Sequence, residues 1–132
     1  MTAHHLLRPD GLVHSPAFSH VAIVPPGATT IYVGGQNAVD GAGALVGEGD
    51  VAAQSVRALQ NVAVALAAAG ASLKDVVQWT VLFVDGVDIA AGYAAIAGDL
   101  ASDEPGLITA ARVVGLGVPG ALVEISAIAA VV

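Results

Sequence analysis

Apolar and polar residues alternate with two different periods along this chain, and the two periods predict strands and helices in a definite order. Short β-branched runs at residues 20–24 and 29–33 flank a Pro-Pro-Gly-Ala turn signal at residues 25–28. This arrangement predicts that the two runs form an antiparallel hairpin. Residues 34–37, which read Gly-Gly-Gln-Asn, then interrupt the pattern, so a glycine-rich loop is predicted there.

Between residues 51 and 69, apolar and small residues recur at alternating spacings of three and four, which is the period of a helix with one buried face. Asp50 stands where an N-cap is needed, and Gly70 follows the last periodic residue, where glycine commonly ends a helix. We therefore expect a helix over residues 51–69 that packs a face of small side chains on a sheet.

The remainder of the chain predicts three further strands and one more helix. Residues 76–84 read VVQWTVLFV, a run of β-branched and aromatic residues that is typical of a central strand. A helix is predicted over residues 89–100, and strands are predicted over 107–114 and 121–131. This order of elements favours a single α+β domain over residues 1–132, with two helices packed on one face of a mixed β-sheet.

Composition adds an expectation about assembly and location. Hydrophobic residues make up 56% of the chain and charged residues only 11%, and the many small Ala and Val side chains leave apolar surface that invites self-association. No uninterrupted apolar stretch reaches the roughly 20 residues that span a membrane. The N-terminus lacks the features of a secretory signal and the chain has no cysteine, so a cytoplasmic location is expected.

The charge balance argues against nucleic acid as a partner. The net charge is −7, and four scattered positions carry the permanent cations, which cannot form a basic stripe: Arg8, Arg57, Lys74 and Arg112. The four histidines lack the spacing of metal ligands, so no metal is expected. No dinucleotide fingerprint follows Gly34 and Gly35 either, and no cofactor is predicted.

Glu124 is the most informative residue, because it is the only carboxylate set inside an uninterrupted apolar run, residues 121–132. Moving an unpaired charge out of water costs several kcal/mol, so such a group is expected to have a partner or to be neutralised. Either outcome suits a general acid or base. Two structural alternatives remain open at this point: Glu124 could lie on the wet face of an edge strand with Ser126, or pair with Arg112 on a neighbouring strand.

Residues 52–85 resemble the YjgF/RidA family, whose members also carry the label endoribonuclease L-PSP. The matching positions follow the family pattern of a Q-x-x-x-x-L-x-N-V helix, an A-G turn and a D-V-V and T-V-x-V-x-D strand: Gln54, Leu59, Asn61, Val62, Ala69, Gly70, Asp75, Val76, Val77, Thr80, Val81 and Asp85. Three further blocks occur in the family order, at residues 16–20, 32–36 and 123–129. The resemblance therefore covers almost the whole chain.

This resemblance implies a chorismate-mutase-like fold and a homotrimer that binds small molecules in clefts between subunits. In the best-known subgroup the activity is hydrolysis of short 2-imino acids to 2-oxo acids and ammonia, without a cofactor or metal. Carried over by position, Glu124 matches the glutamate that positions the attacking water, and Phe18 matches the aromatic residue that closes the pocket. The turn that contacts the ligand corresponds to Gly34, Gly35 and Gln36.

Two departures from the family pattern change the expected substrate. Counting back without a gap from the strand that contains Glu124 puts Thr109 where the family has its carboxylate-binding arginine, and Gly34 replaces a hydroxyl residue. A guanidinium forks two hydrogen bonds onto a carboxylate, whereas threonine offers one neutral donor, so affinity for 2-imino acids should fall. Arg112 could substitute only if a bulge intervened, because an odd offset along a strand puts it on the opposite face.

The sequence thus supports three hypotheses. The first is a RidA-like hydrolase in which Glu124 activates water against a small imine or enamine other than the usual 2-imino acids. The second is a trimer that binds a small metabolite without chemistry. The third, an endoribonuclease or translation inhibitor, is the poorest of the three because of the negative charge. Ligand-contacting candidates are Phe18, Gly34, Gly35, Gln36, Thr109 and Arg112.

Overall fold

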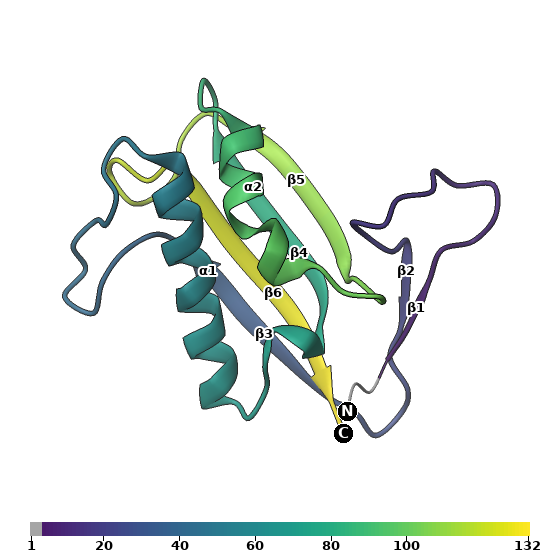
Figure 1. Cartoon of the computed structure of the whole chain (residues 1–132). Coiled ribbons are helices and arrows are strands. Elements are labelled where there is room, and N and C mark those ends of the chain that lie inside the picture. The colour runs from purple at the N-terminus through teal and green to yellow at the C-terminus, as the bar shows by residue number, and fades with distance from the viewer. Residues whose placement is uncertain (1–3) are drawn as a thin grey trace.

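In the computed structural model, which describes residues 4–132, two helices cover one face of a four-stranded sheet (Figure 1). A separate two-stranded ribbon extends from the sheet near the N-terminus. The elements in chain order are β1 His5–Leu7, β2 Val21–Ile23, β3 Thr29–Gln36, α1 Val51–Ala68, the 3-10 turn η1 Leu73–Asp75, β4 Val76–Val84, α2 Ile89–Leu100, β5 Leu107–Val113 and β6 Val123–Val131. The predicted α+β class, with two helices on one face of a mixed sheet, is confirmed.

The sheet has the strand order β3-β6-β4-β5, so the C-terminal strand lies in its interior. Strand β4 pairs with β5 in parallel, and α2 makes the crossover that a parallel connection requires. Strand β6 pairs antiparallel with both β3 and β4. The second face of the sheet is left without a helix (Figure 1).

The predicted hairpin between residues 20–24 and 29–33 is wrong. Strand β2 pairs with β1, with His5 opposite Ile23, whereas β3 pairs with β6, with Thr29 opposite Val131. The turn at residues 25–28 therefore links the ribbon to the sheet. A nine-residue apolar strand far along the sequence offers β3 a longer ladder than three-residue β2 can, and that partner outcompetes the local one.

The predicted loop at residues 34–37 is also wrong over most of its length, because β3 continues to Gln36. The ladder to β6 places Val33 opposite Ala127 and Gln36 opposite Ile125, so Gly34 and Gly35 together face the single residue between those partners. This is a β-bulge, which bends a strand while keeping it in the sheet. The two glycines mark an irregular strand rather than its end.

Both helices lie where the sequence predicts them. The Asp50 side chain accepts a hydrogen bond from the backbone N–H of Ala53 and caps α1, and Gly70 follows the helix with a φ of 76°. Helix α2 spans the predicted residues and is capped by Asp88. The core lies between the helices and the sheet and includes Leu59, Val62, Leu66, Phe83, Ile96 and Ile125. Among residues 4–132, no helix combines the length and apolar character needed to cross a membrane.

Candidate functional site

The uncovered face of the sheet carries a row of hydroxyl groups from three adjacent strands. Along β6, Val123 and Ile125 are buried toward the helices, so Glu124 and Ser126 point to the other face and are half-buried. Ser126 is opposite Thr80 of β4, and Thr80 is level with Thr109 of β5. The row therefore combines three neutral donors and ends at the bulge of β3.

Glu124 lies one step along the strand from this row, opposite Leu82. Its carboxylate rests on the backbone of Gly35, because a Cβ atom on Gly35 would lie 2.5 Å from both Cδ and Oε2 of Glu124. Any side chain at this position would displace the acid. The second glycine of the bulge thus provides the space in which the Glu124 carboxylate sits, which is a specific reason for glycine there.

A shallow hollow of about 240 Å³ lies beside Glu124 on the same face. It is lined by Tyr32, Gly34, Gln78, Thr80, Ser126 and Ile128, together with two core residues. Successive residues on one face of a strand are about 7 Å apart. A single small molecule can therefore contact the Glu124 carboxylate and the hydroxyls of Thr80 and Ser126 at the same time. The hollow offers neutral polar groups on an apolar floor.

A buried glutamine fixes the start of β6 and with it the position of Glu124. The Gln54 side chain is fully buried in α1. Its Nε2 donates to the carbonyls of Gly47 and Gly120 at 3.1 and 3.2 Å, and its Oε1 accepts from the backbone N–H of Leu122 at 2.8 Å. One side chain therefore ties two loops and the entry to β6 to the helix, with every bond satisfied.

Two asparagines tie the end of β3 to the same region. The Asn37 side chain donates to the Val123 carbonyl at 3.1 Å, and Asn61 of α1 donates to the carbonyls of Asn37 and Val39 at 2.9 Å. Sequence reasoning named Gln54 and Asn61 only as motif positions and missed their positioning role. The signal that could have revealed it is the amide of Gln54 within the otherwise small-residue face of an amphipathic helix.

Arg112 lies on the opposite face of the sheet from Glu124. The register of β4 and β5 is continuous, with Arg112 level with Phe83, whose side chain is in the core. The Arg112 guanidinium donates to the Val87 carbonyl at 3.4 Å, near the start of α2. No bulge interrupts β5 between Thr109 and Arg112, so alternation along the strand separates the two side chains. Within its own chain Arg112 does not reach the Glu124 hollow.

Phe18 lies far from Glu124 within one chain. The next residue, Ser19, donates its backbone N–H to the Gly106 carbonyl at 3.2 Å, which places Phe18 near the start of β5. Glu124 is opposite Leu82, which is level with Ala111 of β5. Ala111 lies about 13 Å along β5 from the first residue of that strand, so Phe18 and Glu124 are at different ends of the sheet. The Phe18 ring packs edge-on against His20 instead, with ring centroids 5.3 Å apart.

The structure thus brings together some of the predicted site residues and separates others. Glu124, Gly34, Gly35 and Thr109 share the uncovered face of the sheet. The Gln36 side chain donates to the Gly34 carbonyl at 3.3 Å and so braces the bulge. Within the described part of the chain, no three His, Asp or Glu residues are grouped so that they could hold a metal ion.

Comparison with known proteins assigns this architecture to a class. Residues 12–131 match the family described as Endoribonuclease L-PSP. The chain belongs to this family, which is the YjgF/RidA family of the sequence resemblance. No curated protein matches the chain in sequence.

Solved structures of related proteins share the fold over most of their length. The Rid-family protein YyfB from Yersinia pestis is 29% identical with a TM-score of 0.85, covering 98% of this chain and 100% of that one. RidA from an Antarctic Psychrobacter is 28% identical with a TM-score of 0.70, covering 99% and 100%. TdcF from E. coli, solved with bound serine, is 26% identical with a TM-score of 0.68, covering 83% and 85%.

Proposed function

We propose that this protein is a RidA-like hydrolase that deaminates small imines or enamines lacking the carboxylate of the usual 2-imino acids. One observation carries the proposal: the Glu124 carboxylate is held against Gly35 on the uncovered sheet face, beside a hollow lined by hydroxyl groups. Family membership supports the reaction class, and the chain's own residues define the substrate.

The chemistry assigned to Glu124 is general base and then general acid catalysis. The carboxylate accepts a proton from a bound water, whose oxygen forms a bond to the carbon of the C=N group. The electron pair of the C=N double bond moves to nitrogen, and Glu124 returns the proton there to give the neutral hemiaminal. Glu124 then passes the proton of the hemiaminal hydroxyl to the nitrogen as the C–N bond breaks, and a carbonyl compound and ammonia are released. Water and imine are the only reactants, so atoms and charge balance. An enamine enters the same route after it takes up a proton at carbon.

The substrate class follows from the donors around the hollow. Thr80, Ser126 and Thr109 offer neutral hydrogen bonds, whereas a carboxylate is best bound by the two parallel N–H groups of a guanidinium. The Arg112 guanidinium lies on the other face. The site is therefore suited to a neutral polar substrate, and we expect poor turnover of 2-imino acids.

We further propose that the active form is a homotrimer in which a second copy completes each hollow. On its own face the hollow is shallow, and Tyr32 at its margin is 76% exposed, which is a large aromatic surface for a side chain that faces solvent. Phe18 lies at the other end of the sheet, so a neighbouring copy would have to bring Phe18 of the partner subunit over Glu124. The bound serine in the related TdcF structure supports a small ligand in this class of protein.

The test is turnover by the Glu124→Gln variant. Imines are generated in situ by enzymatic oxidation, with dioxygen as oxidant, of a panel of primary amines and amino-acid amides that lack a carboxylate, and ammonia release is measured against the uncatalysed rate. We expect the variant to lose at least about 100-fold in kcat while it keeps its assembly and unfolding temperature. Glu48→Gln, at an exposed loop position, is the matched control and should keep full activity. Undiminished turnover in Glu124→Gln would contradict the proposal.

A second candidate function is favoured by the missing guanidinium: a trimer that binds a small metabolite without converting it. Under this alternative the wild-type protein shows ligand binding and no ammonia release with any imine of the panel. Glu124→Gln would then weaken binding or assembly rather than turnover. The same two proteins therefore separate the candidates.

A further inference from the structure

A cavity separate from the Glu124 hollow lies at the opposite end of the molecule from Glu124. It has a volume of about 320 Å³, opens to solvent, and is lined by η1, the beginning of β4, the end of α2 and the loop that precedes β5. Glu124 is opposite Leu82 near the other end of β4, on the uncovered face, whereas this cavity opens on the helix-covered side. The two sites do not share a residue.

The floor of the cavity is apolar and aromatic. Trp79, Leu73 and Leu100 line it, and Trp79 is only 4% exposed, so its indole belongs to the core as well as to the cavity lining. Gly106 brings its backbone close to β4 beside this indole, because a Cβ atom there would lie 3.1 and 3.2 Å from the carbonyl oxygens of Val76 and Val77. Pockets that bind small molecules combine such a floor with a few polar groups and measure about 300 to 1,000 Å³. The cavity is therefore at the small end of that range.

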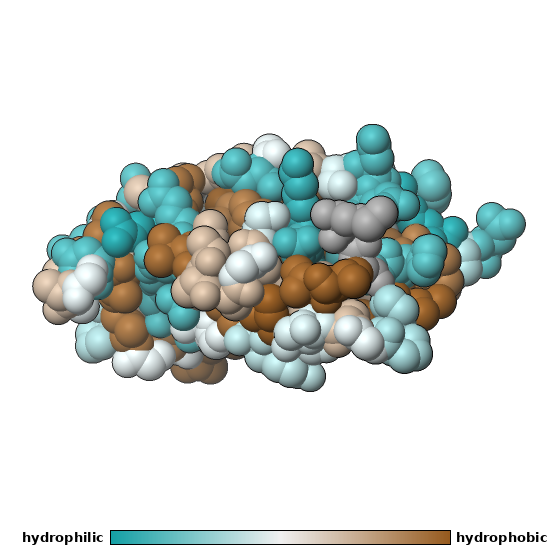
Figure 2. Space-filling model, turned by 90° about the horizontal axis from the view of Figure 1, so that it is seen from below, coloured by the Kyte–Doolittle hydropathy of each residue, from teal (hydrophilic) through white to brown (hydrophobic). Residues whose placement is uncertain are grey.

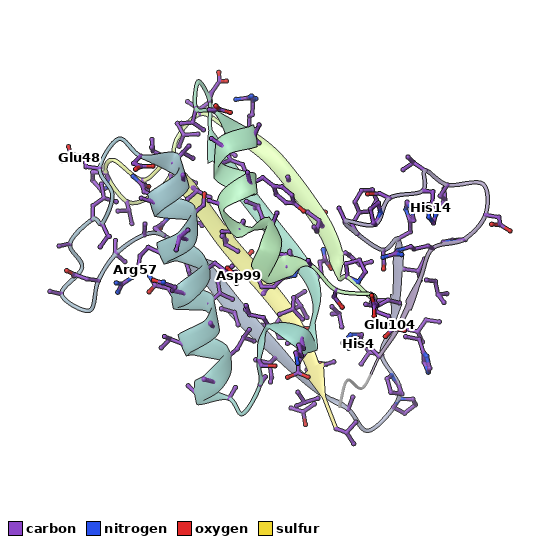
Figure 3. The ribbon with its side chains drawn as sticks, viewed as in Figure 1. His4, His14, Glu48, Arg57, Asp99 and Glu104 are labelled. Carbon is purple, nitrogen blue, oxygen red and sulfur yellow. The ribbon has the colours of Figure 1, made fainter. Side chains whose placement is uncertain are left out.

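Charges of both signs surround the mouth. Lys74 extends from η1, Asp99 from the last turn of α2 and Glu104 from the loop before β5, and all three residues are exposed. Figure 3 shows Asp99 on α2 and Glu104 on the loop before β5, on different segments of the chain, and Figure 2 shows that apolar and polar patches alternate on the surface seen from below. The Lys74 ammonium group and the carboxylates of Asp99 and Glu104 are together complementary in charge to a ligand that carries one positive and one negative group.

We propose that this cavity is a second ligand site, which binds a small amino acid with a short apolar side chain. The ammonium group of the ligand is attracted by Asp99 and Glu104, its carboxylate pairs with Lys74, and its apolar side chain packs against Trp79. This site is separate from the Glu124 hollow, and the proposal does not depend on the reaction assigned there.

The chain contains a single tryptophan, so its indole signal reports on this cavity alone. The experiment titrates the full-length protein with L-norvaline and follows Trp79 fluorescence together with the one indole N–H resonance in NMR. Two probes lack one charge each: butylamine has no carboxylate, and pentanoate has no amine. We expect saturable binding of norvaline with a Kd of about millimolar, and binding at least about tenfold weaker for each single-charge probe.

Charge variants identify the site. Lys74→Gln and the double variant Asp99→Asn/Glu104→Gln should each weaken norvaline binding about tenfold. The control variants Arg8→Gln and Asp10→Asn/Glu48→Gln change the net charge equally, away from the cavity, and should bind as the wild type does. Glu124→Gln should also bind normally. The proposal is overturned if norvaline leaves the Trp79 signals unchanged, if butylamine or pentanoate binds equally well, or if only Glu124→Gln loses binding.

Discussion

At the scale of single residues, the absence of a side chain at Gly35 determines where the Glu124 carboxylate lies. The carboxylate of Glu124 occupies the volume in which the Cβ of any other residue at position 35 would lie. Gly35 does not have a positive φ, so alanine can adopt its backbone conformation without strain. The consequence of a substitution there is thus a displaced carboxylate rather than a broken strand.

This geometry predicts the effect of Gly35→Ala. The methyl group would push the far end of the Glu124 side chain aside at little cost in stability, because that end is flexible and half-buried. We expect kcat for imine hydrolysis to fall about tenfold or more, since a shift of about 1 Å in a catalytic group is costly. The change in the free energy of unfolding should remain below about 1 kcal/mol.

The matched control is Gly41→Ala, where the Cβ would meet nothing within 4 Å and φ is also not positive. It should leave both turnover and stability close to the wild type. If Gly35→Ala turned over substrate as fast as this control, the carboxylate position would not matter for the reaction. Steady-state ammonia release and urea unfolding curves of the two variants provide the measurements.

At the scale of elements, two glycines in α2 have opposite roles. Gly92 faces α1 and the sheet, where a Cβ would lie 2.8 Å from the Phe83 ring and 3.1 Å from Ser55 Oγ. Gly98 is exposed, and a Cβ there would meet nothing within 4 Å. Gly92 permits close packing of the two helices on the sheet. Gly98 has no such packing role, so its only effect is the lower helix propensity of glycine relative to alanine.

Alanine substitutions therefore should change stability in opposite directions. Gly92→Ala is expected to lower the free energy of unfolding by about 1 to 2 kcal/mol, because the buried Phe83 ring has little room to move. Gly98→Ala is expected to raise it by about 0.5 to 1 kcal/mol. Denaturant unfolding of the two single variants measures both values. A stabilised Gly92→Ala would show that the packing of α2 on Phe83 is looser than described.

At the scale of the whole molecule, the uncovered sheet face gives a prediction about assembly. We expect the protein to sediment at three times the chain mass of 12.9 kDa. Tyr32→Glu would place a charge in the proposed contact between copies and should shift the protein toward monomer. Val64→Glu, at an exposed position on the outer side of α1, is the control and should leave the trimer intact. Sedimentation velocity distinguishes the species, and a monomeric wild type would contradict the proposed assembly.

A second whole-molecule prediction concerns pH. Burial lowers the pKa of His4 below its ordinary value of 6.5, although Asp75 and Glu104 act to raise it. The unfolded chain therefore binds a proton at His4 more readily than the folded chain does. The stability associated with neutral His4 is fully present above pH 6.5 and is lost as pH falls from there through the lower folded pKa.

The free energy of unfolding should accordingly decrease as pH falls below 6.5, and His4→Gln should flatten part of that decrease. His14→Gln replaces an exposed histidine and should keep the wild-type profile. Chemical unfolding between pH 5 and 8 measures the three profiles. Identical slopes for His4→Gln and the wild type would exclude His4 as the source.

What the sequence by itself determined lies within short segments. The caps and spacings of residues 50–70 and 89–100 set both helices, because these signals involve neighbouring residues. For the same reason the β-branched runs predicted strands at 76–84, 107–114 and 121–131, which the structure has at Val76–Val84, Leu107–Val113 and Val123–Val131. Glu124 could be singled out for the same reason, since one acid interrupts an apolar run. The family resemblance also came from short motifs, and the comparison with known proteins confirms it.

Only the tertiary structure decided which strands pair and on which face each side chain lies. The pairing of β3 with β6 joins residues about one hundred positions apart, and no local pattern encodes that choice. The bulge at Gly34 and Gly35 has the same composition as a loop, and only the register with β6 reveals it as part of a strand. Strand register, once it is fixed by distant partners, determines the direction of every side chain. Here it places Thr109 on the same uncovered face as Glu124 and Arg112 on the helix-covered face.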